Sequence, residues 1–522
     1  MSDTVILFED EGYRSFLPLV YSRPVYELRC GIFSLRERLA AMLVRQPAAL
    51  CRPHLAAVYG GRRWPLGLLS EHSPLIFVNG RALGADWLLK LMGEPVNTIY
   101  VARGTVLLGA RLSPTLASAV LLDLLEQRGA AALAELRRFT RVVDLDAPLL
   151  TNLWDLITAN GEQIVRDLPL LGQSIGWASA ADRPIAQPGV VIHNPAQVFL
   201  HPHARLDGPL VLDARDGPIV IDAAQIEPFS FIQGPAAIGP GALIASARIR
   251  AETTIGPICR IGGEVEASIV QGYSNKHHDG FLGHSYLGEW VNVGAMTTNS
   301  DLKNTYGTIR VALEGQGQVD SGILKLGCFL ADHVKLGIGL HLNGGAVIGT
   351  GSNIFGVHFA PKTIPPFTWG GEVFREYRID GMIDVSRKVM GRRKVALGPA
   401  YEAITARGVR DDARQPRRDR RCAPAPPARP RRRACARAGR GRGAARGRGG
   451  ASTASQAFVA GCRLQVAGCS CRLQVAGGGC RLPAGRVAGC RLAGCRLRLQ
   501  VGGWYDRWGL PANQKRIAAH LY

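Results

Sequence analysis

Aliphatic residues recur at about every sixth position through the middle of the chain. The first run is separated by intervals of 6, 6, 6, 5, 6 and 6 residues: Ile226, Ile232, Ile238, Ile244, Ile249, Ile255 and Ile261. The spacing resumes at Leu287 and Val293 and continues through Leu324, Leu330, Leu336, Leu342, Ile348 and Ile354. A six-residue period fits neither an α-helix nor a two-faced strand. It is typical of hexapeptide coils, in which one aliphatic residue per short strand points into a prism-shaped core. We therefore predict a parallel β-helix over residues 181–400, with a meander of short strands as the weaker alternative.

The first 180 residues show strands alternating with helices. TVILF (4–8) and PLIFVNG (74–80) predict buried strands that end in loops. SLRERLAAML (34–43) predicts a helix with Ser34 as its N-cap, and TLASAVLLDLLEQRG (115–129) predicts a helix that ends at a glycine. This alternation indicates a Rossmann-like α/β domain over residues 1–180.

The basic charge of the chain is concentrated at residues 401–522. This segment has 26 Lys and Arg against 5 Asp and Glu, whereas the rest of the chain has 37 against 36. Its Arg/Gly/Ala-rich composition and its degraded copies of CRLQVAG predict a disordered tail without a core. The tail is either a nucleic-acid-binding arm or, as we prefer, repetitive GC-rich DNA translated past the natural end of the domain.

Cysteine use and hydropathy indicate the compartment. Cys30, Cys51, Cys259 and Cys328 stand singly before residue 401, which favours reduced thiols. The N-terminus has no basic segment followed by an apolar one, and no stretch approaches eighteen apolar residues. We expect a soluble cytoplasmic protein without a membrane span.

Three histidines fall in NKHHDGFLGHSYLGEWVNVGA (275–295), which interrupts the six-residue repeat and predicts a protruding loop. With GHSYLGEWVNVGAMTTNSD and LKLGCFLADHVKLGIGLHLNGGAVIG, the region at about 220–390 resembles the acetyltransferase half of bifunctional N-acetylglucosamine-1-phosphate uridylyltransferase/glucosamine-1-phosphate acetyltransferases. The second motif resembles the archaeal and alternative bacterial branches. The resemblance implies a left-handed parallel β-helix, acetyl-CoA as a substrate and a homotrimer.

The family motifs also imply catalytic residues. The family's catalytic histidine lies fourteen residues before the asparagine of a V-N-x-G-A motif, which matches His278 and Asn292 here, whereas His284 does not fit the spacing. An imidazole near neutrality could take the proton from a sugar amine as it attacks the thioester, and Asn292 would orient the amine or the sugar. Two alternatives to a catalytic role stay open. The histidines could form hydrogen bonds only within the loop, or His277, His278 and His284 could bind zinc.

Substrate-binding positions match the family less closely. Asn299 corresponds to a second family asparagine, while a family tyrosine is Phe281 here and a substrate-binding lysine falls on Glu266. Lys276 or Lys303 could supply the missing positive charge for a sugar phosphate.

The start of the chain is similar to sugar-phosphate nucleotidyltransferases. EGYRSFLPLVYSRPVYELRCGIFSLRE (11–37) matches their pattern at Gly12, Arg14, Pro18, Arg23, Pro24 and Gly31. The resemblance implies that Gly12, Arg14 and Arg23 bind nucleotide phosphates. Asn79 and Gly80 would stand at the family's metal-binding pair. The family lysine is Val25 here, and Glu9, Asp10 and Glu11 would repel a triphosphate unless Mg²⁺ intervened.

Together the two resemblances imply a transferase of UDP-N-acetylglucosamine biosynthesis. It would acetylate an amino-sugar 1-phosphate from acetyl-CoA and then transfer a uridylyl group from UTP with Mg²⁺. Two alternatives stay open. Only one of the two domains is catalytic, or the β-helix is a non-enzymatic scaffold with a nucleic-acid-binding tail.

Overall fold

The computed structural model describes residues 3–60, 73–83, 86–171, 176–185 and 187–405, together with four strands beyond residue 460. The chain forms two compact units, Met1–Pro427 and Ala428–Tyr522. In the second unit, β35 (Cys462–Val466) pairs antiparallel with β36 (Cys469–Leu473), and β37 (Val487–Leu492) pairs antiparallel with β38 (Cys495–Gln500). The rest of the predicted basic tail, from residue 406 on, lies outside the described residues.

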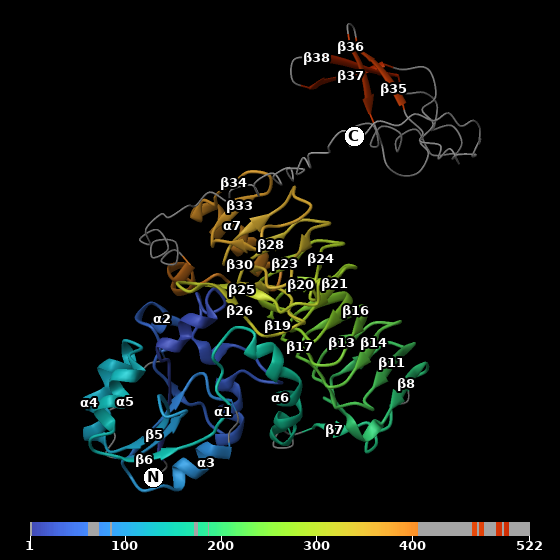
Figure 1. The fold of residues 1–522 in the computed structure, drawn as a ribbon. Helices are drawn as coiled ribbons and strands as arrows, with labels where there is room; N and C mark the ends of the chain where they lie inside the picture. The colour runs from blue at the N-terminus through green and yellow to red at the C-terminus, as the bar shows by residue number, and fades with distance from the viewer. Residues whose placement is uncertain are drawn as a thin grey trace, which may run out of the picture. The chain divides into compact units, whose positions relative to one another are not determined.

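The N-terminal part is a mixed sheet between helices, as the alternating pattern predicts (Figure 1). Its strands, in spatial order, are β2 (Ala48–Ala49), β1 (Thr4–Phe8), β3 (Leu75–Asn79), β5 (Val106–Leu112), β4 (Thr98–Ala102) and β6 (Arg141–Asp144). The helices are α1 (Leu35–Leu43), α2 (Ala56–Tyr59), α3 (Asp86–Gly93), α4 (Pro114–Leu125), α5 (Gly129–Leu136) and α6 (Asp155–Leu171).

The period of two in the strands divides the apolar side chains between two cores. In β1, Val5 and Leu7 face a core with α1 and α3, while Ile6 and Phe8 face a core with α4 and α5. Ser34 caps α1 in a capping box with Glu37, as predicted. The helix predicted for 115–129 ends earlier, at Leu125, and Gly129 instead begins α5.

The following residues form a parallel β-helix, which confirms the interpretation of the six-residue repeat. One sheet stacks β8 (Val190–His193), β11 (Leu210–Asp213), β14 (Phe231–Gln233), β16 (Leu243–Ile249), β18 (Arg260–Glu266), β20 (Asn275–Lys276), β23 (Asn292–Val293), β28 (Lys335–Leu336), β31 (Asn353–Ile354), β33 (Thr368–Gly370) and β34 (Phe374–Glu376), with β10 (Arg205–Leu206), β13 (Gln225–Ile226) and β21 (Phe281–Gly283) beside it. A second sheet stacks β7 (Ala178–Ser179), β9 (Val198–Leu200), β12 (Ile219–Ile221), β15 (Ala236–Ile238), β17 (Thr253–Ile255), β19 (Ile269–Gly272), β22 (Tyr286–Glu289), β27 (Phe329–Leu330), β30 (Val347–Ile348) and β32 (Thr363–Ile364).

Smaller elements complete this part of the chain. β24 (Thr298–Asn299) pairs with β29 (His341–Leu342), and β25 (Arg310–Leu313) and β26 (Gly317–Asp320) form an antiparallel hairpin. α7 (Ile379–Gly391) follows the last coil, and residues 399–405 are helical. Among the described residues, no helix has the length and apolar character needed to cross a membrane.

The repeated aliphatic residues stack in the interior of the β-helix. Ile238 aligns with Ile255, and the same column continues through Val270, Leu287, Leu330 and Ile348. Every repeat position predicted to be interior is buried except Leu324, whose side chain is 51% exposed. Leu324 lies after the β25–β26 hairpin, and its spacing of six from Leu330 is a coincidence of that insertion.

Segment 275–295 is not a protruding loop, contrary to the prediction. It continues the coil through β20, β21, β22 and β23, and the break in the repeat arises because polar residues take inward positions. Lys276 aligns with the interior Ile261, and Asn299 aligns with the interior Leu342.

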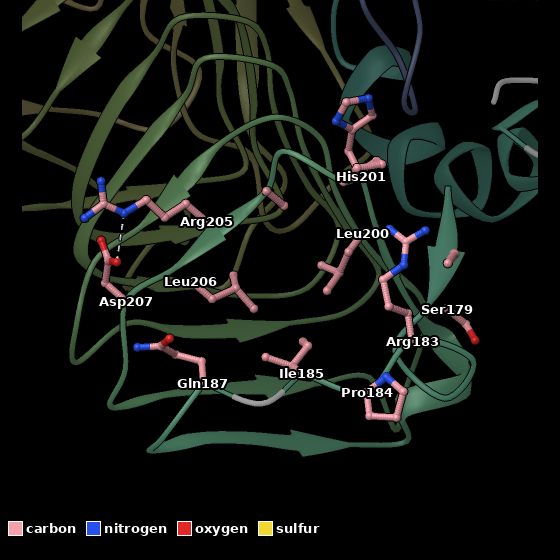
Figure 2. Close-up of a pocket in the computed structure, with 13 residues that line it drawn as sticks. Ser179, Arg183, Pro184, Ile185, Gln187, Leu200, His201, Arg205, Leu206 and Asp207 are labelled. Carbon is pink, nitrogen blue, oxygen red and sulfur yellow. Dashed lines mark hydrogen bonds and ion pairs between the residues drawn. The ribbon is translucent and has the colours of Figure 1, made fainter. Parts of the chain in front are cut away.

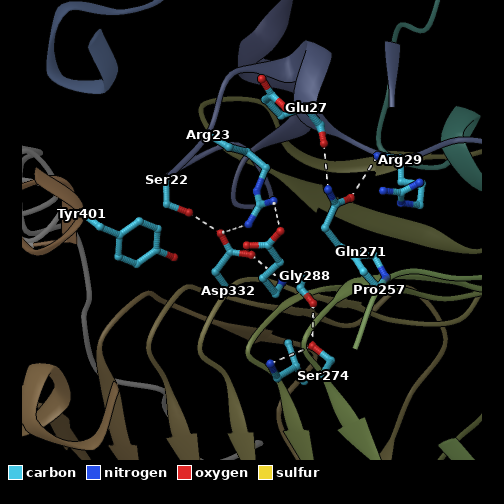
Figure 3. Close-up of polar contacts among 12 residues, drawn as sticks. Ser22, Arg23, Glu27, Arg29, Pro257, Gln271, Ser274, Gly288, Asp332 and Tyr401 are labelled. Carbon is cyan, nitrogen blue, oxygen red and sulfur yellow. Dashed lines mark hydrogen bonds and ion pairs between the residues drawn. The ribbon is translucent and has the colours of Figure 1, made fainter. Parts of the chain in front are cut away.

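The β-helix packs tightly against the N-terminal part. Outward residues Ile269, Tyr286 and Phe329 of the second sheet share a hydrophobic core with Phe16 and Val25 of the N-terminal loop region. Polar contacts reinforce this packing: the Gln271 amide donates to the Glu27 carbonyl, and the Arg29 backbone N–H donates to Gln271 (Figure 3). The two parts therefore act as one folded unit.

Candidate functional site

The His278 corner is a tight turn of the coil between β20 and β21. Gly280 has φ +129°, and a Cβ there would lie 2.3 Å from the Thr297 carbonyl oxygen. Gly262 on the coil below is equally constrained, because a Cβ would lie 1.9 Å from the His277 carbonyl oxygen. The sequence HHDG therefore folds as a closely stacked corner with a fixed backbone.

His278 is exposed at this corner. Its carbonyl oxygen accepts a hydrogen bond from Lys276 Nζ at 2.9 Å, and its ring lies edge-on to His277 with 5.2 Å between centroids. The Nδ1 atom of His277 is buried and has no hydrogen-bond partner in the described part of the chain. His278 thus combines a held backbone with an imidazole that solvent can reach.

A groove of about 460 Å³ begins at the residues that follow His278. Asp279, Gly280 and Phe281 line it together with Arg248 and Glu264 from the two preceding coils. The Arg248 guanidinium lies 3.5 Å from the Glu264 carboxylate. The groove therefore offers aromatic surface and both signs of charge, which suits a polar ligand with a sugar ring.

Asn292 lies on the coil that follows His278's own, in the same sheet. It is exposed on β23, stacks on Asn275 of β20, and accepts a hydrogen bond from Asn275 Nδ2 at 3.0 Å. His278 follows Asn275 by three residues. The structure thus places both predicted catalytic residues on neighbouring coils, beside the strand that leads into the corner.

Other predicted substrate-binding residues face inward or are engaged. Lys276 is 2% exposed, and its ammonium donates to the carbonyl oxygens of Gly262 and His278. Asn299 is buried, accepts from the Gly283 N–H and donates to the Gly283 carbonyl, both at 2.9 Å. Lys303 donates to the Thr308 carbonyl. Only Phe281 of this group lines the groove.

His284 pairs with Asp301 at the other end of β21, which the sequence reasoning did not anticipate. Its Nδ1 lies 2.8 Å from Asp301 Oδ2. Burial would raise the pKa of Asp301, but the hydrogen bond and charge of His284 and the charge of Lys325 lower it overall. No group of three or more potential metal ligands occurs among the described residues, so the zinc alternative finds no support there.

The predicted nucleotide site is filled by internal ion pairs. The Asp10 carboxylate binds the Arg81 guanidinium at 2.5 and 2.7 Å, and the guanidinium lies where a Cβ on Gly12 would be. Glu9 pairs with Arg52 at 3.1 Å, and Glu11 accepts from the first N–H groups of α5. Each of the three carboxylates expected to repel a triphosphate therefore has a structural partner.

The residues at the predicted metal-binding pair do not fit Mg²⁺. Asn79 donates to Asp10 and to the Leu107 carbonyl, and its oxygen accepts from the Arg81 N–H. Gly80 is packed, because a Cβ would lie 2.9 Å from the Tyr26 ring. Both carboxylate oxygens of Asp10 already bind Arg81. The side chains of Asp10 and Asn79 therefore present no free ligand for a hard cation.

Arg23 lies at the contact between the N-terminal part and the β-helix, and not in an open nucleotide-binding crevice. It is 2% exposed, and its guanidinium lies 2.7 Å from Asp332 of the β-helix (Figure 3). Glu289, also on the β-helix, lies 3.1 Å from the same guanidinium. Arg14, in contrast, is exposed, with its guanidinium 5.9 Å from the centroid of the Tyr13 ring.

A second groove, of about 430 Å³, lies on the first coils of the β-helix (Figure 2). Ile185, Leu200 and Leu206 form its apolar wall, and Arg205 pairs with Asp207 at 3.0 Å. No residue predicted to be functional lines this groove. The groove beside the His278 corner is therefore the better candidate for the functional site.

The first part of the chain is similar to known transferases. Residues 5–174 match the family model described as sugar nucleotidyl transferase. This part is therefore similar to sugar nucleotidyl transferases. The bifunctional protein GlmU of Acidithiobacillus ferrooxidans is 35% identical to the chain over 164 residues, 30% of each protein. The bifunctional sugar-1-phosphate nucleotidylyltransferase/acetyltransferase of Sulfurisphaera tokodaii is 33% identical over 92 residues, 18% of this chain and 23% of that protein.

These relatives confirm the resemblance predicted from the sequence motifs, although the chain spans less than a third of the length of the curated relatives it matches. Among solved structures, an acetyltransferase from Bacillus cereus is 16% identical and covers 40% of this chain and 98% of its own, at a TM-score of 0.21. The N-acyltransferase AntD from Bacillus cereus is 13% identical and covers 42% of this chain and 100% of its own, at a TM-score of 0.18. At TM-scores this low, neither likeness establishes anything about the function of this chain.

Proposed function

We propose that the β-helix transfers an acetyl group from acetyl-CoA to the amine of an amino-sugar 1-phosphate. The observation that carries this proposal is an exposed imidazole, His278, on a rigid corner beside a polar groove. The matches to bifunctional sugar-1-phosphate transferases support the same reaction class.

The reaction needs one proton acceptor near the nucleophile. His278 takes one proton from the neutral sugar amine as the nitrogen attacks the thioester carbon. As the new C–N bond forms, the C–S bond breaks, and the imidazolium returns its proton to the departing thiolate of CoA. Asn292, on the neighbouring coil, offers an amide that can orient the sugar beside the base.

Release of free CoA thiol tests this proposal. We expect thiol release from acetyl-CoA that depends on glucosamine 1-phosphate, together with an acetylated product of the matching mass. In an Asn292→Ala variant, kcat/KM is expected to fall by about 10- to 100-fold, because the sugar is no longer oriented beside the base. Wild-type protein that released no thiol with any amino-sugar phosphate would contradict the proposal.

Uridylyl transfer by the N-terminal domain is the second candidate, because residues 5–174 match the sugar nucleotidyl transferase family. The buried pairs Asp10–Arg81 and Glu9–Arg52 argue against it, since they occupy the region where phosphates would bind. Pyrophosphate release from UTP and N-acetylglucosamine 1-phosphate, measured with and without Mg²⁺, shows whether the N-terminal domain catalyses uridylyl transfer. An Arg14→Ala variant then reports whether the exposed arginine contributes.

A homotrimer is proposed by analogy with the family. Exposed apolar side chains on consecutive coils, Met296 and Ile338, support contact between copies along the β-helix. Light scattering gives the mass in solution, and Ile338→Glu is expected to lower it to that of the single chain.

A further inference from the structure

Charged side chains form a row next to the proposed acetylation groove. Glu264 aligns with Phe281, and Glu266 aligns with Gly283, so that these four residues lie on the same outward face of β18 and β21. A Cβ on Gly283 would lie 2.4 Å from Phe281 Cζ and 2.6 Å from Asp301 Oδ2. The Phe281 ring and the Asp301 carboxylate therefore meet above Gly283, and the groove surface continues from Phe281 to this row.

The row contains Glu266, Lys325, Asp301 and His284. Lys325 Nζ lies 3.5 Å from Glu266 Oε1, and His284 Nδ1 lies 2.8 Å from Asp301 Oδ2. Lys325 comes from the end of the insertion that contains the β25–β26 hairpin, where it forms a bridge with Leu302. The insertion thus places a cation beside the outward carboxylate of Glu266.

Lys325 differs from the lysines considered for phosphate binding. Lys276 is buried with its ammonium on two carbonyl oxygens, and Lys303 donates to the Thr308 carbonyl. The Lys325 side chain is 53% exposed, and at 3.5 Å its contact with Glu266 is longer than a good charge-assisted hydrogen bond. Such a half-exposed pair holds its cation weakly, so a dianionic ligand can compete for it.

We propose that Lys325 binds the phosphate of the amino-sugar substrate, with the ring of His284 as a second contact. This inference rests on the proposed acetyl transfer. Glu266 stands where the family has a substrate-binding lysine, and an acidic group there would repel a phosphate. Lys325, 3.5 Å from that carboxylate, supplies the cation from a different segment of the chain.

The test compares a phosphorylated with an unphosphorylated acceptor. The probes are glucosamine 1-phosphate and glucosamine, assayed by thiol release with wild-type protein, Lys325→Ala, Lys325→Arg and the double variant Glu266→Lys/Lys325→Ala. In Lys325→Ala the preference in kcat/KM for the phosphorylated sugar is expected to fall by about 10- to 100-fold, the effect of losing one charge-assisted contact. Lys325→Arg should retain most of the preference, and the double variant should regain part of it.

Lys388→Ala is the matched control, since it removes an exposed lysine on α7. An unaltered preference in Lys325→Ala, or an equal loss in Lys388→Ala, would overturn the proposal. If the wild-type protein releases no thiol, the acetyl-transfer proposal fails first. Calorimetric titration of glucosamine 1-phosphate then decides the role of Lys325: weaker binding by Lys325→Ala than by wild type supports it, and equal or undetectable binding by both overturns it.

Discussion

The guanidinium of Arg23 lies 2.7 Å from the carboxylate of Asp332, a residue 309 positions further along the chain. Both side chains are almost fully buried, and Glu289 completes the cluster at 3.1 Å from Arg23. Burial alone would lower the pKa of Arg23, but the charges of Asp332 and Glu289 raise it well above its usual value. The arginine is therefore charged at all relevant pH values and joins the N-terminal α/β part to the β-helix.

Removing this arginine should destabilise the whole folded unit. Arg23→Ala leaves the buried Asp332 carboxylate and the partly exposed Glu289 carboxylate without their cation, which costs about 3–5 kcal/mol. The midpoint of urea unfolding, followed by tryptophan fluorescence, measures the effect. Arg14→Ala is the control, because Arg14 is exposed and its loss should change stability by less than about 0.5 kcal/mol. Equal midpoints for the two variants would refute the structural role of Arg23.

The interior column of the β-helix can be tested with two aliphatic residues that the sequence repeat treats alike. Ile244 is fully buried, whereas Leu324 is 51% exposed beyond the hairpin. Ile244→Ala should therefore cost about 2–5 kcal/mol through the cavity it creates, and Leu324→Ala should cost little. Thermal unfolding of both variants gives the comparison, and similar losses would mean that Leu324 is a core residue after all.

Lys276 makes stability depend on pH. Burial lowers its pKa from 10.5 to about 8, against the opposing charge of Asp279. Between about pH 8 and 10.5 the unfolded chain keeps this proton and the folded chain has released it. The contribution of Lys276 to stability therefore rises as the pH increases through that window.

The apolar variant Lys276→Met removes this titration. The difference in unfolding temperature, Lys276→Met minus wild type, should be largest at pH 7. It should decrease as the pH rises from about 8 to 10.5, because the wild-type protein gains stability over that range. Lys388→Met on the exposed face of α7 should show no such trend. A difference between Lys276→Met and wild type that stayed constant across this range would contradict the assignment.

The repeat predicts the β-helix because one inward aliphatic residue per strand is a local signal that most of the strands share. It fails at Lys276 and Asn299, which occupy inward positions because backbone carbonyl and N–H groups satisfy their polar atoms. It also fails at Leu324, because spacing alone does not reveal that a hairpin intervenes. These exceptions depend on contacts between coils, which no single hexapeptide encodes.

The candidate site is predicted only in part. The family spacing leads to His278 and Asn292, which the structure places on neighbouring coils, but their roles stay predictions. Arg23 matches a family position, yet its surroundings are set by Asp332 and Glu289 from the distant β-helix. A signal for this packing exists in the sequence: Ile269, Tyr286 and Phe329 each precede an interior residue and make the outward face of the second sheet apolar as well.

The central claim is that His278 is the proton acceptor for acetyl transfer, and one comparison tests it most directly. The rate of glucosamine 1-phosphate-dependent thiol release is measured for His278→Ala and for His284→Ala, the neighbouring histidine held by Asp301. We expect kcat to fall by about 10²- to 10⁴-fold in His278→Ala, and His284→Ala to act chiefly on KM for the phosphorylated sugar. A His278→Ala protein with wild-type kcat, or a loss of kcat confined to His284→Ala, would contradict the account.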